Sequence, residues 1–204
     1  MKNVLVIGST GQIGSELTMK LRREIPGSTV VAGYIPGAEP KGELLESGPA
    51  EIADVRDAAA LAAIVGKYQI DTVYNLAALL SAVAERKPLL AWDIQMNGLL
   101  NILEVAREKG VAVFTPSSIG SFGPETPHVG TPQDTIQRPR SMYGVTKVAT
   151  ELHVPETDHR RRERTGRKER LRQASLAGGV APDEGKLFSP AYGERERQGF
   201  TGSK

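Results

Sequence analysis

The first fourteen residues limit the choice of fold more than any other stretch of this 204-residue chain. An apolar run at residues 4–7 predicts a buried strand, and it leads directly into the sequence Gly8-Ser9-Thr10-Gly11-Gln12-Ile13-Gly14. Apolar residues then return at near-helical spacing as far as Pro26 and Gly27, where the predicted helix ends. A strand, a glycine turn and a helix in this order bring backbone N–H groups at the helix start close to a pyrophosphate. We therefore expect a dinucleotide site here rather than a plain tight turn.

Strands and helices alternate along the next hundred residues. The expected strands are residues 29–34, 52–53, 71–76 and 111–115, and the expected helices are residues 57–68 and 89–109. This alternation is typical of an α/β fold with a doubly wound parallel sheet. Residues 120–140 are rich in Gly, Pro and Thr, and we expect them to form a loop folded across the site.

One helical turn separates Tyr143 from Lys147, so both side chains leave the same face of a helix. A phenol ordinarily holds its proton up to about pH 10, and a neighbouring cation stabilises the phenolate. Such a pair supplies a general base for alcohol and ketone chemistry. The pair alone also fits an exposed tyrosine beside a solvated lysine, and the glycine motif argues for the chemical interpretation.

The composition argues against several other classes of protein. The chain has no cysteine, which excludes disulfides and thiolate metal sites, and its three histidines, His128, His153 and His159, lack the spacing of a zinc helix. We expect no bound metal. The N-terminus carries a strand rather than an export signal, and no run approaches a membrane span, so we expect a cytoplasmic protein of one domain.

The charge is divided unevenly along the chain. Residues 1–154 carry 14 basic and 16 acidic residues, whereas residues 155–204 carry 12 and 8. Apolar periodicity almost disappears after Leu152, and basic residues crowd together from Arg160 to Arg172. We therefore divide the chain into residues 1–152, a nucleotide-binding domain with the Tyr/Lys pair, and residues 153–204, a basic tail that we expect to be disordered or non-native.

Three further stretches carry a family resemblance: Asn75-Leu76-Ala77-Ala78-Leu79-Leu80-Ser81-Ala82, Pro116-Ser117-Ser118-Ile119-Gly120-Ser121-Phe122-Gly123-Pro124 and Gln137-Arg138-Pro139-Arg140-Ser141-Met142-Tyr143. With the glycine loop and the Tyr/Lys pair, they resemble the extended short-chain dehydrogenase/reductase (NAD-dependent epimerase/dehydratase) family. Within that family they are most similar to the short-chain type of L-threonine 3-dehydrogenase. The resemblance covers about the first three quarters of the chain. It implies a Rossmann-like sheet, NAD as cofactor, and oxidation of the C3 hydroxyl of L-threonine to 2-amino-3-oxobutanoate.

The same resemblance implies a role for each matching residue. Gly8, Gly11 and Gly14 would lie under the pyrophosphate, with Gln12 and Ile13 supplying backbone donors. Asp54 would sit near the adenine, Ala77 and Ala78 would leave room for the cofactor, and Leu80 and Ser81 would face the nicotinamide half and the substrate. The implied catalytic residues are Ser118, Tyr143 and Lys147. Ser118 and Tyr143 would also contact the substrate, and Tyr143 and Lys147 the cofactor.

Several of these residues also fit purely structural roles. Ser118 and its neighbour Ser117 can cap or turn the chain after a strand. Ser81 can serve as the N-cap of a helix, and Asp54 can cap the helix expected from Asp57. These alternatives stay open at the level of sequence.

The chain departs from the family at the end of its second strand. The family has an acidic residue about there, which would bind the adenosine ribose, whereas this chain has Ala32-Gly33-Tyr34-Ile35. Tyr34 can only stack or donate one hydrogen bond. No arginine cluster lies nearby to receive a ribose phosphate, so NAD remains the expected cofactor rather than its phosphorylated form.

A second departure follows Leu152, where the family continues its helix, adds a core strand and builds a substrate lobe. Here Pro155 is expected to break the helix, and the later C-terminal strands and substrate lobe are expected to be missing. The strand at residues 111–115 would then be an exposed edge that favours aggregation. One hypothesis is an out-of-frame tail, since residues 166–171 can be back-translated so that a one-base shift gives Asp-Val-Arg-Ser-Val, which resembles the family's missing strand.

Three functions are therefore weighed: a competent threonine dehydrogenase, an inactive nucleotide-binding remnant, and a separate binding role for the basic tail. The related sugar-nucleotide epimerases and dehydratases share the glycine loop and the Tyr/Lys pair, and they are a further alternative. We expect a small-molecule substrate, weak cofactor binding and slow or no turnover, and a homodimer formed through the long helix and the Tyr/Lys helix. Neither a membrane nor a nucleic acid is an expected partner, because the Arg-rich run lacks interleaved aromatic residues.

Overall fold

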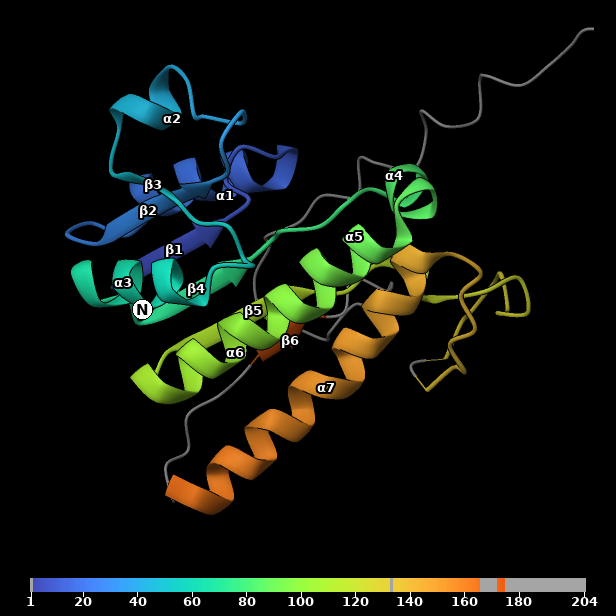
Figure 1. Cartoon of the computed structure of the whole chain (residues 1–204). Helices are drawn as coiled ribbons and strands as arrows, with labels where there is room; N and C mark the ends of the chain where they lie inside the picture. The colour runs from blue at the N-terminus through green and yellow to red at the C-terminus, as the bar shows by residue number, and fades with distance from the viewer. Residues whose placement is uncertain (1, 133, 166–171, 175–204) are drawn as a thin grey trace, which may run out of the picture.

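A parallel sheet forms the centre of the molecule (Figure 1). The computed structural model describes residues 2–132, 134–165 and 172–174. Within these residues the sheet has six strands in the order β3-β2-β1-β4-β5-β6, and every neighbouring pair is parallel. The strands are β1 (Asn3–Ile7), β2 (Thr29–Tyr34), β3 (Ala50–Ile52), β4 (Thr72–Asn75), β5 (Ala112–Pro116) and β6 (Arg172–Ala174). Because all strands run the same way, the loops that follow them meet at one edge, which we call the carboxyl edge.

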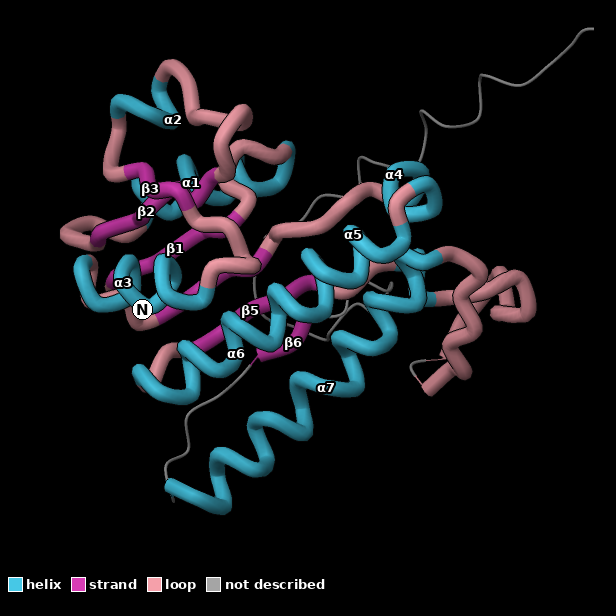
Figure 2. The backbone as a smooth tube through the Cα atoms, in the orientation of Figure 1, coloured by secondary structure: helices cyan, strands magenta, loops and turns pink. Residues whose placement is uncertain are grey.

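Helices cover both faces of this sheet (Figure 2). They are α1 (Gln12–Glu24), α2 (Glu43–Glu46), α3 (Ala58–Lys67), α4 (Ser81–Arg86), α5 (Pro88–Trp92), α6 (Gly98–Lys109) and α7 (Met142–Thr165), with a π-helical turn η1 (Asp93–Asn97) and a 3₁₀ turn η2 (Ile119–Ser121). No helix in the described part of the chain is long and apolar enough to cross a membrane. The doubly wound α/β fold predicted from the sequence is confirmed.

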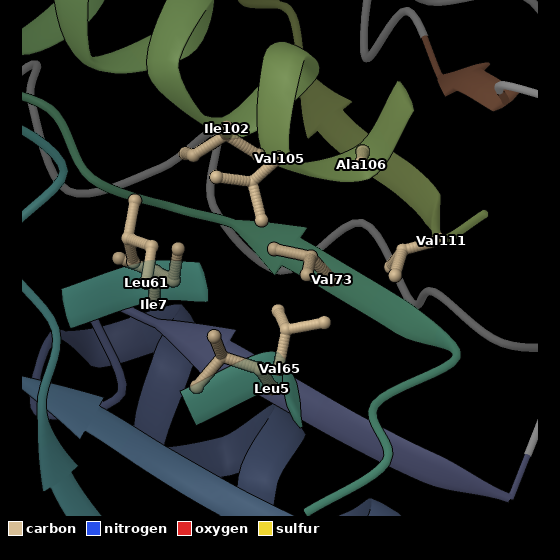
Figure 3. Close-up of a pocket in the computed structure, with 9 residues that line it drawn as sticks. All are labelled: Leu5, Ile7, Leu61, Val65, Val73, Ile102, Val105, Ala106 and Val111. Carbon is tan, nitrogen blue, oxygen red and sulfur yellow. The ribbon is translucent and has the colours of Figure 1, made fainter. Parts of the chain in front are cut away.

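The two faces of β1 show why the sheet is buried on both sides. Leu5 and Ile7 point into a core shared with α3 and α6, whereas Val4 and Val6 pack on the opposite face with Leu21 of α1. Figure 3 shows the first of these cores, where a cavity of about 10 Å³ is lined wholly by apolar side chains. That volume holds one water at most, and an apolar lining gives a water no partners, so we regard the cavity as a packing gap.

The helices begin and end where local chemistry predicts. Asp57 precedes α3 and accepts a hydrogen bond from the Ala60 N–H at 2.9 Å, as a good N-cap does. The helix α6 ends at Gly110, whose φ of 76° closes the helix in the left-handed conformation. The single helix expected over residues 89–109 is instead α5, η1 and α6 in succession, with the wider π turn in the middle.

Two expectations for the C-terminal part are wrong. The helix α7 does not stop before Pro155 but continues to Thr165, because a proline removes only one backbone donor and the turns on either side still hold. The strand β5 is also not an edge, since β6 pairs with it in parallel register and satisfies its backbone groups. The proposed frame shift at residues 166–171 and most of the basic tail, residues 175–204, lie outside the described residues.

Candidate active site

The glycine loop after β1 is held by backbone contacts to the end of β2. The carbonyl of Gly33 accepts three hydrogen bonds, from the N–H groups of Gly8 and Ser9, both at 3.0 Å, and from the Ser9 hydroxyl at 2.9 Å. Gly8 has a φ of 77°, which only glycine adopts without strain. A Cβ atom at Gly14 would lie 2.1 Å from the Gly8 carbonyl oxygen, so this turn cannot close with any other residue.

The start of α1 is open toward the carboxyl edge. Its N-cap is Gly11, and no side chain makes a capping hydrogen bond there. Gly11, Gln12 and Ile13 are all exposed, while Gly14 is buried behind them. Uncapped N–H groups together with the helix dipole form a site for an anion, so this part of the chain fits a pyrophosphate.

The loop after β4 lies directly beside the glycine turn. A Cβ atom at Gly8 would meet the Leu76 carbonyl at 3.2 Å and the Ala77 nitrogen at 3.3 Å. Ala77 is half-buried, whereas Ala78, Leu80 and Ser81 are exposed at the carboxyl edge. Ser81 is the first residue of α4 after the N-cap Leu80, and α4 has no side-chain cap, so the capping alternative for Ser81 is wrong.

Asp54 also lies at the carboxyl edge, after β3, but its carboxylate is already paired. Its oxygens bind the guanidinium of Arg56, with the shortest contact at 2.6 Å, and this hydrogen bond holds the pKa of the Asp54 carboxyl below its usual value. The helix α3 is capped by Asp57, so Asp54 is not its cap. Tyr34 is half-buried at the end of β2, beside these residues.

Tyr143 and Lys147 face one another on α7, as their spacing predicts. The Lys147 Nζ lies 5.6 Å from the centroid of the Tyr143 ring and donates a hydrogen bond to the Pro116 carbonyl at 2.9 Å. Lys147 is 8% exposed, and this burial lowers its pKa from the ordinary 10.5 to about 8, while the charge of Glu151 acts in the opposite direction. At neutral pH the side chain is therefore mostly charged and close to its titration range.

Ser118 and the Tyr143 ring both lie beside Gly120. Its hydroxyl oxygen accepts a hydrogen bond from the Gly120 N–H at 3.2 Å, so it caps η2 as the structural alternative predicted. A Cβ atom at Gly120 would lie 3.2 Å from Tyr143 Cδ1 and 3.5 Å from Ser118 Oγ. The glycine thus lets the ring and the hydroxyl approach the same point, and within the described residues the Ser118 O–H has no acceptor.

A buried side-chain amide, not predicted from the sequence, connects the loop after β4 with helix α7. Gln95 lies on η1, is 6% exposed, and accepts a hydrogen bond from the Leu79 N–H at 3.0 Å. Its Nε2 donates to the hydroxyl of Thr146, which in turn donates to the Tyr143 carbonyl at 2.8 Å. The loop after β4 is thereby linked to the helix of Tyr143 and Lys147. No sequence motif marks Gln95, because its partners are 16 and 51 residues away.

A second set of contacts missed from the sequence lies below Lys147. Glu151 accepts hydrogen bonds from the Ser117 hydroxyl and from Gln137 Nε2, the latter at 2.8 Å. Gln137 Nε2 also reaches Ser121 Oγ at 3.2 Å. The spacing of four residues from Lys147 to Glu151 was the one available signal in the sequence.

Comparisons with known proteins agree with this geometry. The sequence profile of the NAD dependent epimerase/dehydratase family matches residues 4–161. An uncharacterised epimerase/dehydratase of Staphylococcus saprophyticus is 54% identical over 152 residues, which are 74% of this chain and 47% of the relative. The chain thus spans about half the length of the curated relatives it matches.

Solved structures give the same relationship. An L-threonine dehydrogenase from Clostridium difficile is 49% identical with a TM-score of 0.71, over 81% of this chain and 50% of that one. A UDP-glucose 4-epimerase is 26% identical with a TM-score of 0.71, over 85% of this chain and 50% of the epimerase. The profile match covers more than half of the chain, so the chain belongs to the NAD dependent epimerase/dehydratase family, and NAD is its cofactor.

Proposed function

We propose that this chain carries the site for NAD-dependent oxidation of the C3 hydroxyl of L-threonine to 2-amino-3-oxobutanoate. The observation that carries the proposal is the meeting of Ser118, Tyr143 and Lys147 at the carboxyl edge, where the glycine loop also lies. The choice of threonine rests on the higher identity to the C. difficile threonine dehydrogenase, 49%, than to the UDP-glucose 4-epimerase, 26%.

The cofactor would lie along the carboxyl edge. Gly8, Gly11 and Gly14 would let the chain turn beneath the pyrophosphate, and the N–H groups of Gln12 and Ile13 at the start of α1 would donate to it. Asp54 would reach the adenine after one of its hydrogen bonds with Arg56 breaks. At the other end of the cofactor, Ala77, Ala78 and Leu80 would border the nicotinamide half. When bound, NAD supplies the acceptor for the hydride that leaves C3 of the substrate.

The proton chemistry belongs to three side chains. The Tyr143 phenolate oxygen would take the proton from the C3 hydroxyl, and the Lys147 ammonium favours that phenolate through its positive charge. The Ser118 O–H would donate to the reacting oxygen, while its oxygen accepts from the Gly120 N–H. Ser81, exposed at the start of α4, would contact the amino acid.

The test measures NADH formation from L-threonine by absorbance, with the whole chain and with its Tyr143→Phe variant. We expect threonine-dependent NADH formation that the variant lacks. NADH formation that does not depend on threonine, or that the variant retains in full, would contradict the proposal.

A nucleotide-binding form with little turnover is the second candidate. The observation that favours it is that the chain spans about half of its relatives' length. In that case NAD raises the thermal unfolding temperature but L-threonine produces no NADH. Interconversion of UDP-glucose and UDP-galactose would instead favour the epimerase alternative. The cytoplasmic location and the roles weighed for the basic tail stay predictions.

We also propose that the protein forms a homodimer through α5, α6 and α7, which lie side by side (Figure 1). These helices carry exposed apolar side chains: Leu89, Trp92, Leu100, Val145 and Leu152. Sedimentation at micromolar concentration should give a dimer, and Trp92→Glu should shift it toward the monomer. A wild-type protein that sediments as a monomer would contradict this proposal.

A further inference from the structure

Glu151 connects three separate segments beneath the catalytic lysine. It lies one helical turn after Lys147 on α7 and is half-buried. One carboxylate oxygen accepts the Ser117 hydroxyl from the turn after β5, and the other accepts Gln137 Nε2 from residues 135–141, which we call the strap. A single carboxylate therefore holds the strap and the Ser117 turn against α7.

The contacts continue from Glu151 to Ser118. Gln137 Nε2 also donates to Ser121 Oγ, and the Ser121 hydroxyl donates to the Ser118 carbonyl at 2.7 Å. Ser121 has no exposed surface, and the bonds on either side of it are partly buried. Movement of the carboxylate would be passed to the backbone that carries the Ser118 hydroxyl.

Close backbone packing keeps the strap in place around these bonds. A Cβ atom at Gly123 would lie 1.9 Å from the Arg138 carbonyl, and one at Gly144 would lie 2.5 Å from Pro139 Cβ. The strap is thus pressed against the turn after β5 and against the first turn of α7. Gln137 adds to this packing a hydrogen bond with a charged group on α7, the carboxylate of Glu151.

Glu151 is also the charge that acts on Lys147. The elements packed against α7 carry other titratable groups: Glu85 and Arg86 on α4, Asp93 on η1, Glu104, Arg107, Glu108 and Lys109 on α6, and Arg172 on β6. The strap carries Arg138 and Arg140, and α7 itself carries Tyr143 and His153. Among the described residues, Glu151 is the charged group that opposes the effect of burial on the Lys147 pKa. The Lys147 ammonium is otherwise held by the neutral Pro116 carbonyl.

We propose that Glu151 is a positioning residue of this site, whose carboxylate ties the strap and the Ser117 turn to the catalytic helix and supplies the negative charge that faces Lys147. The inference deepens the proposed function, on which it rests for the roles of Ser118 and Lys147. Its two parts are separable. The hydrogen bonds to the strap and to the Ser117 turn depend on where the Glu151 oxygens lie. The effect on Lys147 depends on the negative charge of the carboxylate.

Two variants separate these parts. Glu151→Gln removes the charge at unchanged side-chain length: its carbonyl oxygen can still accept from Gln137 Nε2, and its NH2 group can donate to the Ser117 hydroxyl in place of the carboxylate oxygen that accepted from it. Glu151→Asp keeps the charge but withdraws the oxygens by one methylene. Glu85→Gln is the matched control, because Glu85 also accepts a hydrogen bond on α7, from the Met142 N–H, without acting on Lys147.

The first measurement follows thermal unfolding of the whole, ligand-free chain between pH 6 and 10.5. The folded-state pKa of Lys147, about 8, is below its ordinary 10.5, so stability should rise as the pH climbs through that range. Without the carboxylate the folded-state pKa of Lys147 falls further, so in Glu151→Gln the rise in stability should begin at a lower pH than in the wild type. Glu151→Asp and Glu85→Gln should keep the wild-type onset.

The second measurement follows hydrogen exchange of the strap amides at pH 7. We expect faster exchange in Glu151→Asp and in Gln137→Ala than in the wild type or in Glu85→Gln. An unchanged onset in Glu151→Gln overturns the charge part, and unchanged exchange in both Glu151→Asp and Gln137→Ala overturns the tether part. Neither measurement needs cofactor. A wild type that fails to bind NADH would therefore overturn the proposed function, while the unfolding and exchange measurements would still test the role of Glu151.

Discussion

The glycine loop is one short turn whose backbone is fixed against the end of a neighbouring strand, whereas the region around Lys147 is assembled from groups of several distant segments. The loop closes through Gly8, Gly14 and the carbonyl of Gly33. Around Lys147, the partners come from the end of β5, from the strap and from α7. A binding site for an anion therefore needs little more than a short turn packed against a strand end. The charge state of Lys147 beside Tyr143, in contrast, depends on contacts from several segments of the fold.

The difference appears in how each region would fail. A larger residue in the loop changes the path of the main chain, and nothing elsewhere can compensate. A substitution around Lys147 leaves the path intact and changes charge or hydrogen bonding. The predictions below test this contrast, from the largest expected effect to the smallest.

Tyr143→Phe should reduce threonine-dependent NADH formation by about 10²- to 10⁴-fold, because it removes the proton acceptor and leaves the ring. The affinity for NADH, measured by fluorescence titration, should change little. Tyr68→Phe is the control, since the Tyr68 hydroxyl bonds Glu51 on the far side of β3. Equal turnover in Tyr143→Phe and the wild type would show that the phenol is not the base.

Gly14→Ala should disrupt the glycine loop. Its new Cβ would lie 2.1 Å from the Gly8 carbonyl oxygen, which is too close for any real contact. We expect a loss of about 1–3 kcal/mol in the free energy of unfolding and at least a tenfold loss in NADH affinity, as for other overpacked sites. Gly66→Ala in α3 is the control, because no atom lies within 4 Å of its added Cβ, and it should be neutral or stabilising.

Lys147→Met should remove the pH dependence that this lysine gives to stability. The folded-state pKa of Lys147 is lowered to about 8, so the wild type gains stability as the pH rises from about 8 to 10.5, by an amount on the order of 1–3 kcal/mol. The variant should lack that gain and should be at least as stable at pH 7. A Lys147→Met protein whose stability still rises over this range would assign the effect to another group.

Arg56→Ala should have the smallest effect of the set. Its exposed pair with Asp54 is worth about 0–1 kcal/mol, and the pKa of the Asp54 carboxyl, which Arg56 holds low, should move back toward its usual value. At neutral pH the variant should be less stable than the wild type, and this difference should disappear as the pH falls through the folded-state pKa of Asp54. Denaturant unfolding at pH 7 and pH 3 checks this, and a large effect at pH 7 would mean that the pair is more than a surface contact.

Most of the fold could be predicted because its signals are local. The strand expected at residues 29–34 is β2 at the same boundaries, and the other expected strands and helices are present within a few residues. The π turn η1 was not predicted, because hydrophobic periodicity does not distinguish a five-residue π turn from the α-helix around it. Helix α7 beyond Pro155 and strand β6 were not predicted, because a single proline need not end a helix and a polar segment gives no apolar periodicity that marks a strand.

The candidate site divides in the same way. Tyr143, Lys147 and the glycine loop could be named from spacing alone, since periodicity fixes which residues share a helix face. Gln95 and Glu151 could not, because a buried amide or carboxylate gains meaning only from partners that the fold brings near.

The sequence by itself determined the strand–turn–helix at the N-terminus and the pairing of a phenol with an ammonium, because both follow from backbone sterics and helical spacing. Only the tertiary structure decided that Lys147 is buried against the Pro116 carbonyl with Glu151 as its counter-charge. Burial and charge act through space, and the distances that set them are made by packing rather than by position along the chain.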